Sequence, residues 1–190
     1  MSKARLVILA SGSGTIAQSI FDAVSSGQLA AEIVALVCDQ PGAEVVSRAA
    51  ASSIETHLIP MQSDRKIWDQ AMLKNLTELQ PDLVVCAGFM RILSSEVVSQ
   101  FRIVNSHPAL LPLFPGAHAV RDALAAGSTQ TGTTIHWVDS GIDTGEIIAQ
   151  EAVEITPADT ETSLHERIKI VERRLYVATL QQLIKDLVRS

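Results

Sequence analysis

Cysteine is scarce in this chain: the 190 residues include only Cys38 and Cys86. Each lies inside an apolar run, which is typical of a small buried hydrophobic residue. No Cys/His spacing suits zinc, and two such cysteines do not form a disulfide framework. We therefore expect neither a metal site nor a disulfide.

Long hydrophobic runs are also lacking. No stretch approaches the roughly 18 uninterrupted apolar residues of a membrane helix. The N-terminal apolar run in MSKARLVILA is short, breaks at once into SGSG, and has no small-residue cleavage site. We therefore expect a soluble, cytoplasmic protein with no membrane partner.

Positive charge is sparse. Fifteen Lys and Arg residues stand against 21 Asp and Glu residues, the formal net charge is −6, and no basic block occurs. A general nucleic-acid surface would need a clustered cationic face, so nucleic acid is not an expected partner. Any anionic ligand must instead be bound by local groups such as backbone amides, helix N-termini or single arginines.

Apolar runs alternate with helical patterns along almost the whole chain, which is 47% hydrophobic. This alternation predicts an α/β fold: one doubly wound, mostly parallel twisted sheet with helices on both faces, in a single domain over residues 1–190. A late antiparallel strand pair and a long C-terminal helix complete it. The predicted strands are 6–10, 32–37, 56–59, 83–87, a run that ends at 104, 131–138 and 146–153. The predicted helices are about 16–24, 43–52, 64–79, 95–100, 119–126 and 163–187.

The sequence NSHPALLPLFPG, residues 105–116, follows one of these strands. Asn105 and His107 are two residues apart, which puts both side chains on one face of an extended segment. The prolines that follow predict a stiff, irregular loop. Such a pair can offer two hydrogen bonds to one polarised atom. The alternative is a turn with a satisfied histidine.

A glycine-rich turn, SGSGT at residues 11–15, joins the first strand to the first helix. This arrangement aims free backbone N–H groups and the positive helix end at an anion. A dinucleotide site would need a third glycine, and a Walker loop would need Gly-Lys-Ser/Thr, so a single phosphate fits better. The alternative is a simple tight turn.

The segment GFMRIL, residues 88–93, follows the fourth strand. Met90, Ile92 and Leu93 would form an apolar wall for a flat ring, with Arg91 pointing outward; an ordinary hydrophobic loop is the alternative. Arg65 lies in a first helical turn, where a cation is unfavourable, so it is either a ligand contact or a solvated side chain. Ligands in such sheets bind beyond the carboxyl ends of the strands, where the three segments converge.

Together, NSHPALLPLFPGAH, AGFMRIL, SGSGT and GIDTGEIIAQ resemble the glycinamide ribonucleotide formyltransferases, the folate-dependent transformylases of purine biosynthesis. The resemblance extends from about Leu6 to Leu187. It implies a Rossmann-like formyltransferase fold, with a phosphate-binding half over about 1–100 and a catalytic, folate-binding half over about 101–190. It also implies formyl transfer from 10-formyltetrahydrofolate to glycinamide ribonucleotide. We expect a monomer or homodimer that uses no metal.

The family's catalytic roles would fall on three residues. Asn105 would hydrogen-bond the formyl oxygen, and protonated His107 would stabilise the oxyanion and supply a proton. Asp143 would support the protonated form of His107 and order a water that carries protons from the attacking amine. These roles suit the chemistry, because formyl transfer to an amine develops an oxyanion and requires proton transfers.

The resemblance also implies two sets of substrate contacts. For the ribonucleotide, Gly14, Thr15 and Ile16 would line the phosphate, Gly12 and Ser13 would shape the turn, and Glu172 would contact the amino end. Many family members have Asn where Ile16 stands, so a side-chain contact to the phosphate is lost here. The folate would be surrounded by Arg65, Met90, Arg91, Ile92, Leu93, Val98, Asn105, Asp139, Ser140, Gly141, Ile142 and Asp143.

Two other functions are consistent with the same motifs. One is hydrolysis of 10-formyltetrahydrofolate by a deformylase, in which water replaces the amine. The other is an inactive folate- or nucleotide-binding module, although binding alone would not need Asn105, His107 and Asp143 together. His118 and His136 lie near the motif, and we interpret both as satisfied core or supporting histidines.

Overall fold

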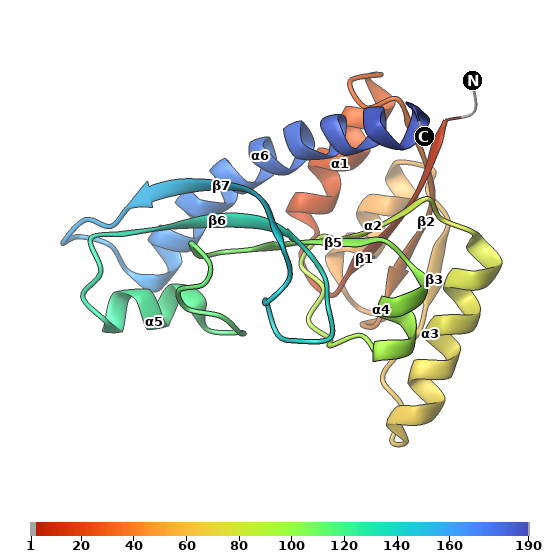
Figure 1. Cartoon of the computed structure of the whole chain (residues 1–190), viewed down its shortest axis with the longest axis horizontal. Helices are drawn as coiled ribbons and strands as arrows, with labels where there is room; N and C mark the ends of the chain where they lie inside the picture. The colour runs from red at the N-terminus through yellow and green to blue at the C-terminus, as the bar shows by residue number, and fades with distance from the viewer. Residues whose placement is uncertain (1–2, 190) are drawn as a thin grey trace.

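Seven strands form one mixed sheet in the computed structural model, which describes residues 3–189 (Figure 1). Their order across the sheet is β3-β2-β1-β4-β5-β6-β7. Strands β1 to β5 pair in parallel, whereas β6 runs antiparallel to both β5 and β7. The strands are β1 (Ala4–Ala10), β2 (Ala31–Cys38), β3 (Thr56–Leu58), β4 (Leu83–Cys86), β5 (Ile103–His107), β6 (Gln130–Trp137) and β7 (Ile147–Glu154). The predicted mostly parallel sheet with a late antiparallel pair is confirmed.

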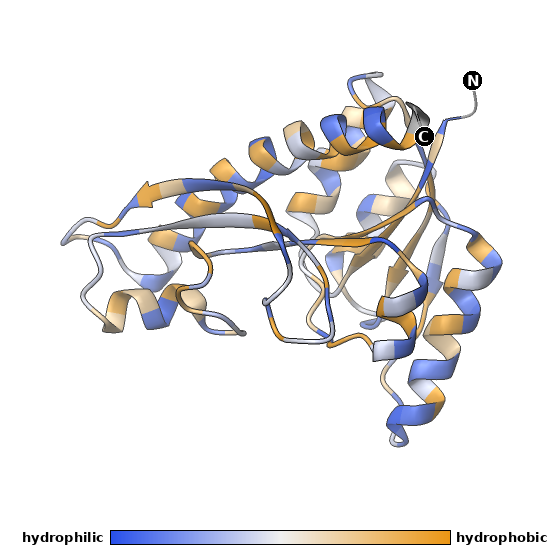
Figure 2. Cartoon of the chain, viewed as in Figure 1, coloured by the Kyte–Doolittle hydropathy of each residue, from blue (hydrophilic) through white to orange (hydrophobic). Residues whose placement is uncertain are grey.

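Helices cover both faces of the sheet. One hydrophobic core lies between the sheet and α1, α2 and α6, and a second lies between the sheet and α3 and α4. Figure 2 shows the apolar residues concentrated on the central strands, while the helices alternate between apolar and polar positions. The helices are α1 (Thr15–Ser25), α2 (Glu44–Ala51), α3 (Arg65–Leu79), α4 (Ser95–Gln100), α5 (Ala119–Ala125) and α6 (Glu161–Arg189).

Two predicted helix starts are confirmed by their capping bonds. The Asp64 carboxylate accepts a hydrogen bond from the Lys66 N–H at 2.8 Å, at the start of α3. The Ser94 hydroxyl accepts one from the Val97 N–H at 3.3 Å, at the start of α4. Each side chain satisfies a backbone donor that has no partner within the helix.

Strand β5 is longer than the apolar run that predicted it. The prediction that the strand ends at Val104 was wrong, because β5 continues to His107. The polar residues extend the strand by pairing with β6: Asn105 lies opposite His136, and His107 lies opposite Thr134. The two side chains named from the sequence therefore sit on a strand, before the proline-rich loop rather than within it.

Tyr176 of α6 ties the longest helix to the sheet. Its side chain is fully buried, and its hydroxyl lies 3.0 Å from the carbonyl oxygens of both Cys86 and Val104. These carbonyls belong to the neighbouring strands β4 and β5. A phenol has one proton to donate, so the hydroxyl serves one carbonyl at a time.

The helices in residues 3–189 include none that combines the length and apolar character needed to cross a membrane.

We expect Tyr176→Phe to lower the free energy of unfolding by about 1–3 kcal/mol, because it removes a buried hydrogen-bond donor while preserving the ring. Urea unfolding followed by circular dichroism measures the change. Thr179→Val is a suitable control on the same helix, since the Thr179 hydroxyl bonds only to its own helix, at Leu175 O. An equal loss in the two variants would contradict a special role for the Tyr176 hydroxyl.

Candidate active site

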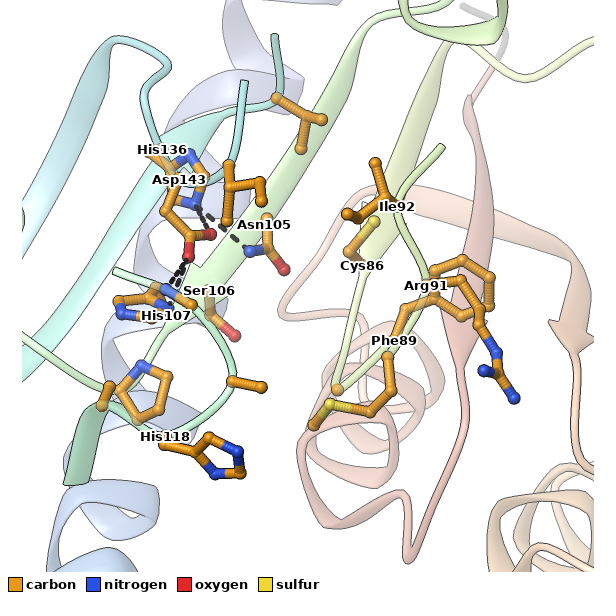
Figure 3. A pocket seen from close by; sticks show the side chains of 18 of the residues that line it. Cys86, Phe89, Arg91, Ile92, Asn105, Ser106, His107, His118, His136 and Asp143 are labelled. Atoms are coloured by element: carbon orange, nitrogen blue, oxygen red, sulfur yellow. Dashed lines mark hydrogen bonds and ion pairs between the residues drawn. The ribbon is translucent and has the colours of Figure 1, made fainter. Parts of the chain in front are cut away.

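A cavity of about 450 Å³ lies at the end of β4 and over the adjoining face of β5 and β6 (Figure 3). It is bounded by the segment after β4, the end of β5 with its following loop, the loop between β6 and β7, and the start of α6. Its lining includes Cys86, Gly88 to Leu93, Asn105 to Pro108, Gly116 to Val120, His136, Val138, Asp139, Gly141 to Asp143, Glu161 and His165. The structure thus brings together four segments that lie far apart in the sequence.

His107 and Asp143 form the central polar contact. The Nδ1 atom of His107 lies 3.3 Å from Asp143 Oδ2, and its Nε2 atom lies 2.8 Å from the Phe114 carbonyl oxygen. Both ring nitrogens therefore face acceptors. An imidazole can donate at both positions only in its protonated form. The geometry thus accommodates an imidazolium, held between two loops.

Asp143 is held in place by its backbone and by its neighbours. It adopts a left-handed conformation with φ of 54°, which is uncommon for a residue other than glycine. Its Oδ2 atom accepts a hydrogen bond from the Gly116 N–H at 2.8 Å. Burial opposes ionisation of this carboxyl, but His136, the Gly116 N–H and His107 outweigh it and lower its pKa below the usual value. Asp143 is therefore a carboxylate at neutral pH.

Asn105 is oriented by His136, which is buried and makes hydrogen bonds, as expected for a satisfied core or supporting histidine. The His136 Nδ1 atom donates to the Trp137 carbonyl oxygen at 2.8 Å, and its Nε2 atom faces both Asn105 and the Asp143 carboxylate, whose Oδ1 atom is 3.6 Å away. Asn105 Nδ2 lies 3.2 Å from this Nε2 atom, which leaves its second N–H for a ligand. The only sequence signal at His136 was the alternation of side chains along residues 131–138, which predicted a strand. It did not show which residue of β5 would lie opposite His136.

The glycine-rich turn leaves the first turn of α1 open. Gly14 is the N-cap residue, with φ of 71°, and no side chain caps the helix. Ile16 is 9% exposed and packs in the hydrophobic core, so only its backbone N–H could reach an anion. Ser11 joins this turn to the segment after β4 by two hydrogen bonds. Its N–H donates to the Gly88 carbonyl oxygen at 3.0 Å, and its hydroxyl oxygen accepts from the Met90 N–H at 2.9 Å. Residues 12–16 lie beside this segment without lining the cavity.

Glu172 of α6 is a buried carboxyl on the other face of the sheet from Asn105 and His107. Burial raises its pKa to about 7, although the Ser106 hydroxyl and the charges of Lys169 and Arg173 partly oppose this rise. Ser106 itself lines the cavity, and its buried hydroxyl oxygen makes no hydrogen bond of good geometry. Ser106 thus links the cavity to the buried carboxyl.

The apolar part of the cavity agrees with the predicted wall. Met90 and Ile92 are 70% and 56% exposed, which is unusual for such large hydrophobic side chains, and both line the cavity with Ile142. Leu93 also lines it but is anchored in the second core. On the opposite side, Asp139 orders the loop by accepting hydrogen bonds from Gly141 N at 3.0 Å and Thr144 Oγ1 at 2.7 Å.

The two arginines are already paired with carboxylates. Arg91 Nε lies 2.6 Å from the fully buried Asp39 carboxylate, so its side chain turns away from His107 and Asp143 (Figure 3). Arg65 pairs with Asp69 at 2.8 Å and donates to the Ile92 carbonyl, which joins α3 to the cavity wall. Arg91 thus points away from the apolar wall, as expected, and its charge is balanced by Asp39. Arg65, Val98 and Ser140 do not line the cavity.

No group of three or more His, Cys, Asp or Glu side chains in the described part of the chain is arranged to hold a metal ion. The donors at the cavity are instead suited to hydrogen bonding.

Comparisons with known proteins point in one direction. A family model described as formyl transferase matches residues 4–180 of this chain. The phosphoribosylglycinamide formyltransferase of Mycobacterium tuberculosis is 47% identical over 184 residues, which cover 95% of this chain and 85% of the relative.

Solved structures show the same similarity. Glycinamide ribonucleotide transformylase 1 from Symbiobacterium toebii matches with a TM-score of 0.94 and 34% identity, covering 97% of this chain and 89% of that one. Phosphoribosylglycinamide formyltransferase from Bacillus halodurans matches with a TM-score of 0.90 and 44% identity, covering 95% of each chain.

Glu172 gives a prediction for the pH dependence of stability. Its folded pKa of about 7 lies above the ordinary value of 4.5. The folded state therefore binds this proton more tightly than the unfolded state, and the stability it contributes is fully present below pH 4.5 and lost as the pH rises through 7. Relative to Glu172→Gln, we expect the wild-type protein to lose about 3 kcal/mol of unfolding free energy between pH 4.5 and 8.

Urea unfolding of both proteins at several pH values measures this difference. Glu146→Gln, at an exposed position, controls for the loss of one carboxylate. Parallel pH profiles for the wild type and Glu172→Gln would contradict the raised pKa.

Proposed function

The chain belongs to the formyl transferase family, and on this basis we propose that it transfers the formyl group of 10-formyltetrahydrofolate to the amine of glycinamide ribonucleotide. It is a formyltransferase related to the phosphoribosylglycinamide formyltransferases, which act in purine biosynthesis. The observation that carries the proposed chemistry is the meeting of Asn105, His107 and Asp143 at one cavity, with the His107 ring 3.3 Å from the Asp143 carboxylate.

Asn105 and His107 supply donors for the developing oxyanion. Attack of an amine on a formyl carbon moves negative charge onto the formyl oxygen, and preorganised donors aimed at that oxygen lower the barrier. Asn105 has a free N–H because His136 takes only one. The two side chains leave the same face of β5. Both ring nitrogens of His107 face protein acceptors, so its donation to the formyl oxygen requires that the Phe114 carbonyl gives way to the substrate.

Asp143 supports the charge on His107 and the movement of protons. Its lowered pKa keeps it ionised at neutral pH, so a negative charge faces the His107 ring at 3.3 Å. The amine must lose a proton and the departing folate nitrogen must gain one. An imidazole paired with a carboxylate suits such transfers near neutral pH.

The remaining assignments divide the chain into two parts. We assign phosphate binding to residues 12–16 and to the half before residue 100, and catalysis and folate binding to the half after residue 101. The exposed Met90 and Ile92 fit a flat, largely apolar ring, and polar groups at the cavity's inner side fit its substituents. Glu172 would contact the ribonucleotide. A cytoplasmic location and a monomeric or homodimeric state stay predictions.

Neither alternative function is favoured by an observation. The relatives described above are named as transformylases or formyltransferases rather than as hydrolases. An inactive binding module would not need a carboxylate, an imidazole and an amide brought together from one strand and one loop.

The decisive test is folate turnover, followed by absorbance, with and without glycinamide ribonucleotide. We expect turnover only when the ribonucleotide is present. Equal turnover without it would establish the deformylase instead, and the phosphate site at residues 12–16 would have to be abandoned.

We expect Asp143→Asn to lower kcat by about 100-fold or more while folate binding is retained, because the amide keeps an acceptor for the Gly116 N–H but loses the charge beside His107. Glu146→Gln is a control in the same loop, since it also converts a carboxylate to an amide, at an exposed residue outside the cavity lining. Steady-state kinetics and folate titration measure both effects. A near-normal kcat for Asp143→Asn would refute the role given to Asp143.

A further inference from the structure

The first turns of α2 contact the glycine-rich turn after β1 directly. The Arg48 Nε–H donates to the Ser13 carbonyl oxygen at 2.7 Å, and the Val45 N–H donates to the Gly12 carbonyl oxygen at 3.1 Å. Two consecutive carbonyls of the turn therefore point toward α2. Arg48 is the residue whose side chain makes one of these bonds.

The direction of these carbonyls fixes the direction of the amides. In a trans peptide the C=O and the N–H point in opposite directions. With the Gly12 and Ser13 carbonyls directed at α2, the N–H groups of Ser13 and Gly14 point away from it. Within residues 3–189 neither N–H donates to another group. Two adjacent free N–H groups beside the first turn of α1 form a concavity suited to an anion.

We propose that Arg48 is a positioning residue that holds the Ser13–Gly14 peptide in the orientation required for phosphate binding. The inference rests on the proposed function, because it assumes that the ribonucleotide phosphate binds at residues 12–16. Arg48 does not touch the phosphate in this arrangement; it acts through the Ser13 carbonyl.

Packing on the α2 side supports this orientation. A Cβ atom on Gly14 would run into the Val45 side chain and come within 2.9 Å of the Val45 Cα. Gly14 therefore lies against α2, and no ligand can approach from that side. An anion must come from the opposite side, toward which the two N–H groups point.

The charge of Arg48 is largely balanced, so its role is geometric. Its Nη2 atom lies 2.6 Å from the Glu44 carboxylate, one helical turn earlier. The planar guanidinium thus bonds a carboxylate and a carbonyl in two fixed directions at once. A lysine carries its donors on one rotating nitrogen. It could donate to the Ser13 carbonyl, but it would hold the peptide in a less defined orientation.

Steady-state kinetics of Arg48→Met test this inference. We expect the KM for glycinamide ribonucleotide to rise about 10- to 100-fold, because the freed peptide can rotate and no longer presents its N–H to a phosphate. The KM for 10-formyltetrahydrofolate and the kcat at saturation should stay near their wild-type values. Arg48→Lys should recover part of the lost affinity, because the ammonium can still donate to the Ser13 carbonyl.

Glu44→Gln is the matched control, since it removes the ion pair but leaves the bond from Arg48 to Ser13. We expect it to keep a KM close to the wild-type value. A rise in this KM equal to that of Arg48→Met would overturn the inference, because the effect would then come from a disturbance of α2 and not from the bond between Arg48 and Ser13.

A second measurement reports on the peptide itself. In proton–nitrogen NMR spectra, addition of inorganic phosphate should move the Gly14 amide proton downfield in the wild type and in Glu44→Gln. The same addition should not move it in Arg48→Met. An unchanged phosphate response in Arg48→Met would overturn the proposed orienting role.

The failure of this inference is distinguishable from failure of the proposed function. A wild-type protein that lacks ribonucleotide-dependent turnover would overturn the function and the role of Arg48 with it. A wild-type protein that shows such turnover, with an unchanged KM in Arg48→Met, would overturn the role of Arg48 alone.

Discussion

The antiparallel pairing of β5 with β6 is the constraint on which the candidate site depends. A parallel sheet buries both faces, and its strands are nearly continuous apolar runs. At β5 the direction of pairing changes, and polar residues enter the strands: Asn105 opposite His136 and His107 opposite Thr134. The loop between β6 and β7 then folds over this face and places Asp143 beside His107. The same polar pairs that build the site also extend the strand.

Helix α6 supports this region from the other face of the sheet. Glu172 and Tyr176 are four residues apart, so they lie on one side of the helix, and both are buried. Tyr176 bonds the carbonyl of Cys86 or Val104, at the level where the cavity begins. The Glu172 carboxyl lies where desolvation makes its ionisation costly. No cation among the described residues forms a hydrogen bond with this carboxyl, so its burial lowers the stability of the fold once it ionises.

The alternation of apolar runs and helical patterns was sufficient to predict the architecture, because local periodicity and caps such as Asp64 and Ser94 specify elements independently of their neighbours. The segments of the site were predictable as well, since each follows a strand end. What could not be predicted were contacts between segments. Arg91 turns toward Asp39 because β2 and β4 both flank β1, and His136 reaches Asn105 because β6 reverses direction. No pattern within a single segment contains that information.

The order of the strands sets a distance that any acceptor must match. The glycine-rich turn follows β1, the side chains proposed to be catalytic lie on β5, and β4 alone lies between these two strands. Neighbouring strands are spaced by about 4.8 Å, so the two positions are separated by about 10 Å across a rigid, hydrogen-bonded sheet. The sheet thus fixes the distance between these two positions. If the phosphate binds at this turn as proposed, an acceptor with a shorter or longer span between its phosphate and its amine would place the amine away from the formyl group. The protein would then select its acceptor by length, without an additional contact.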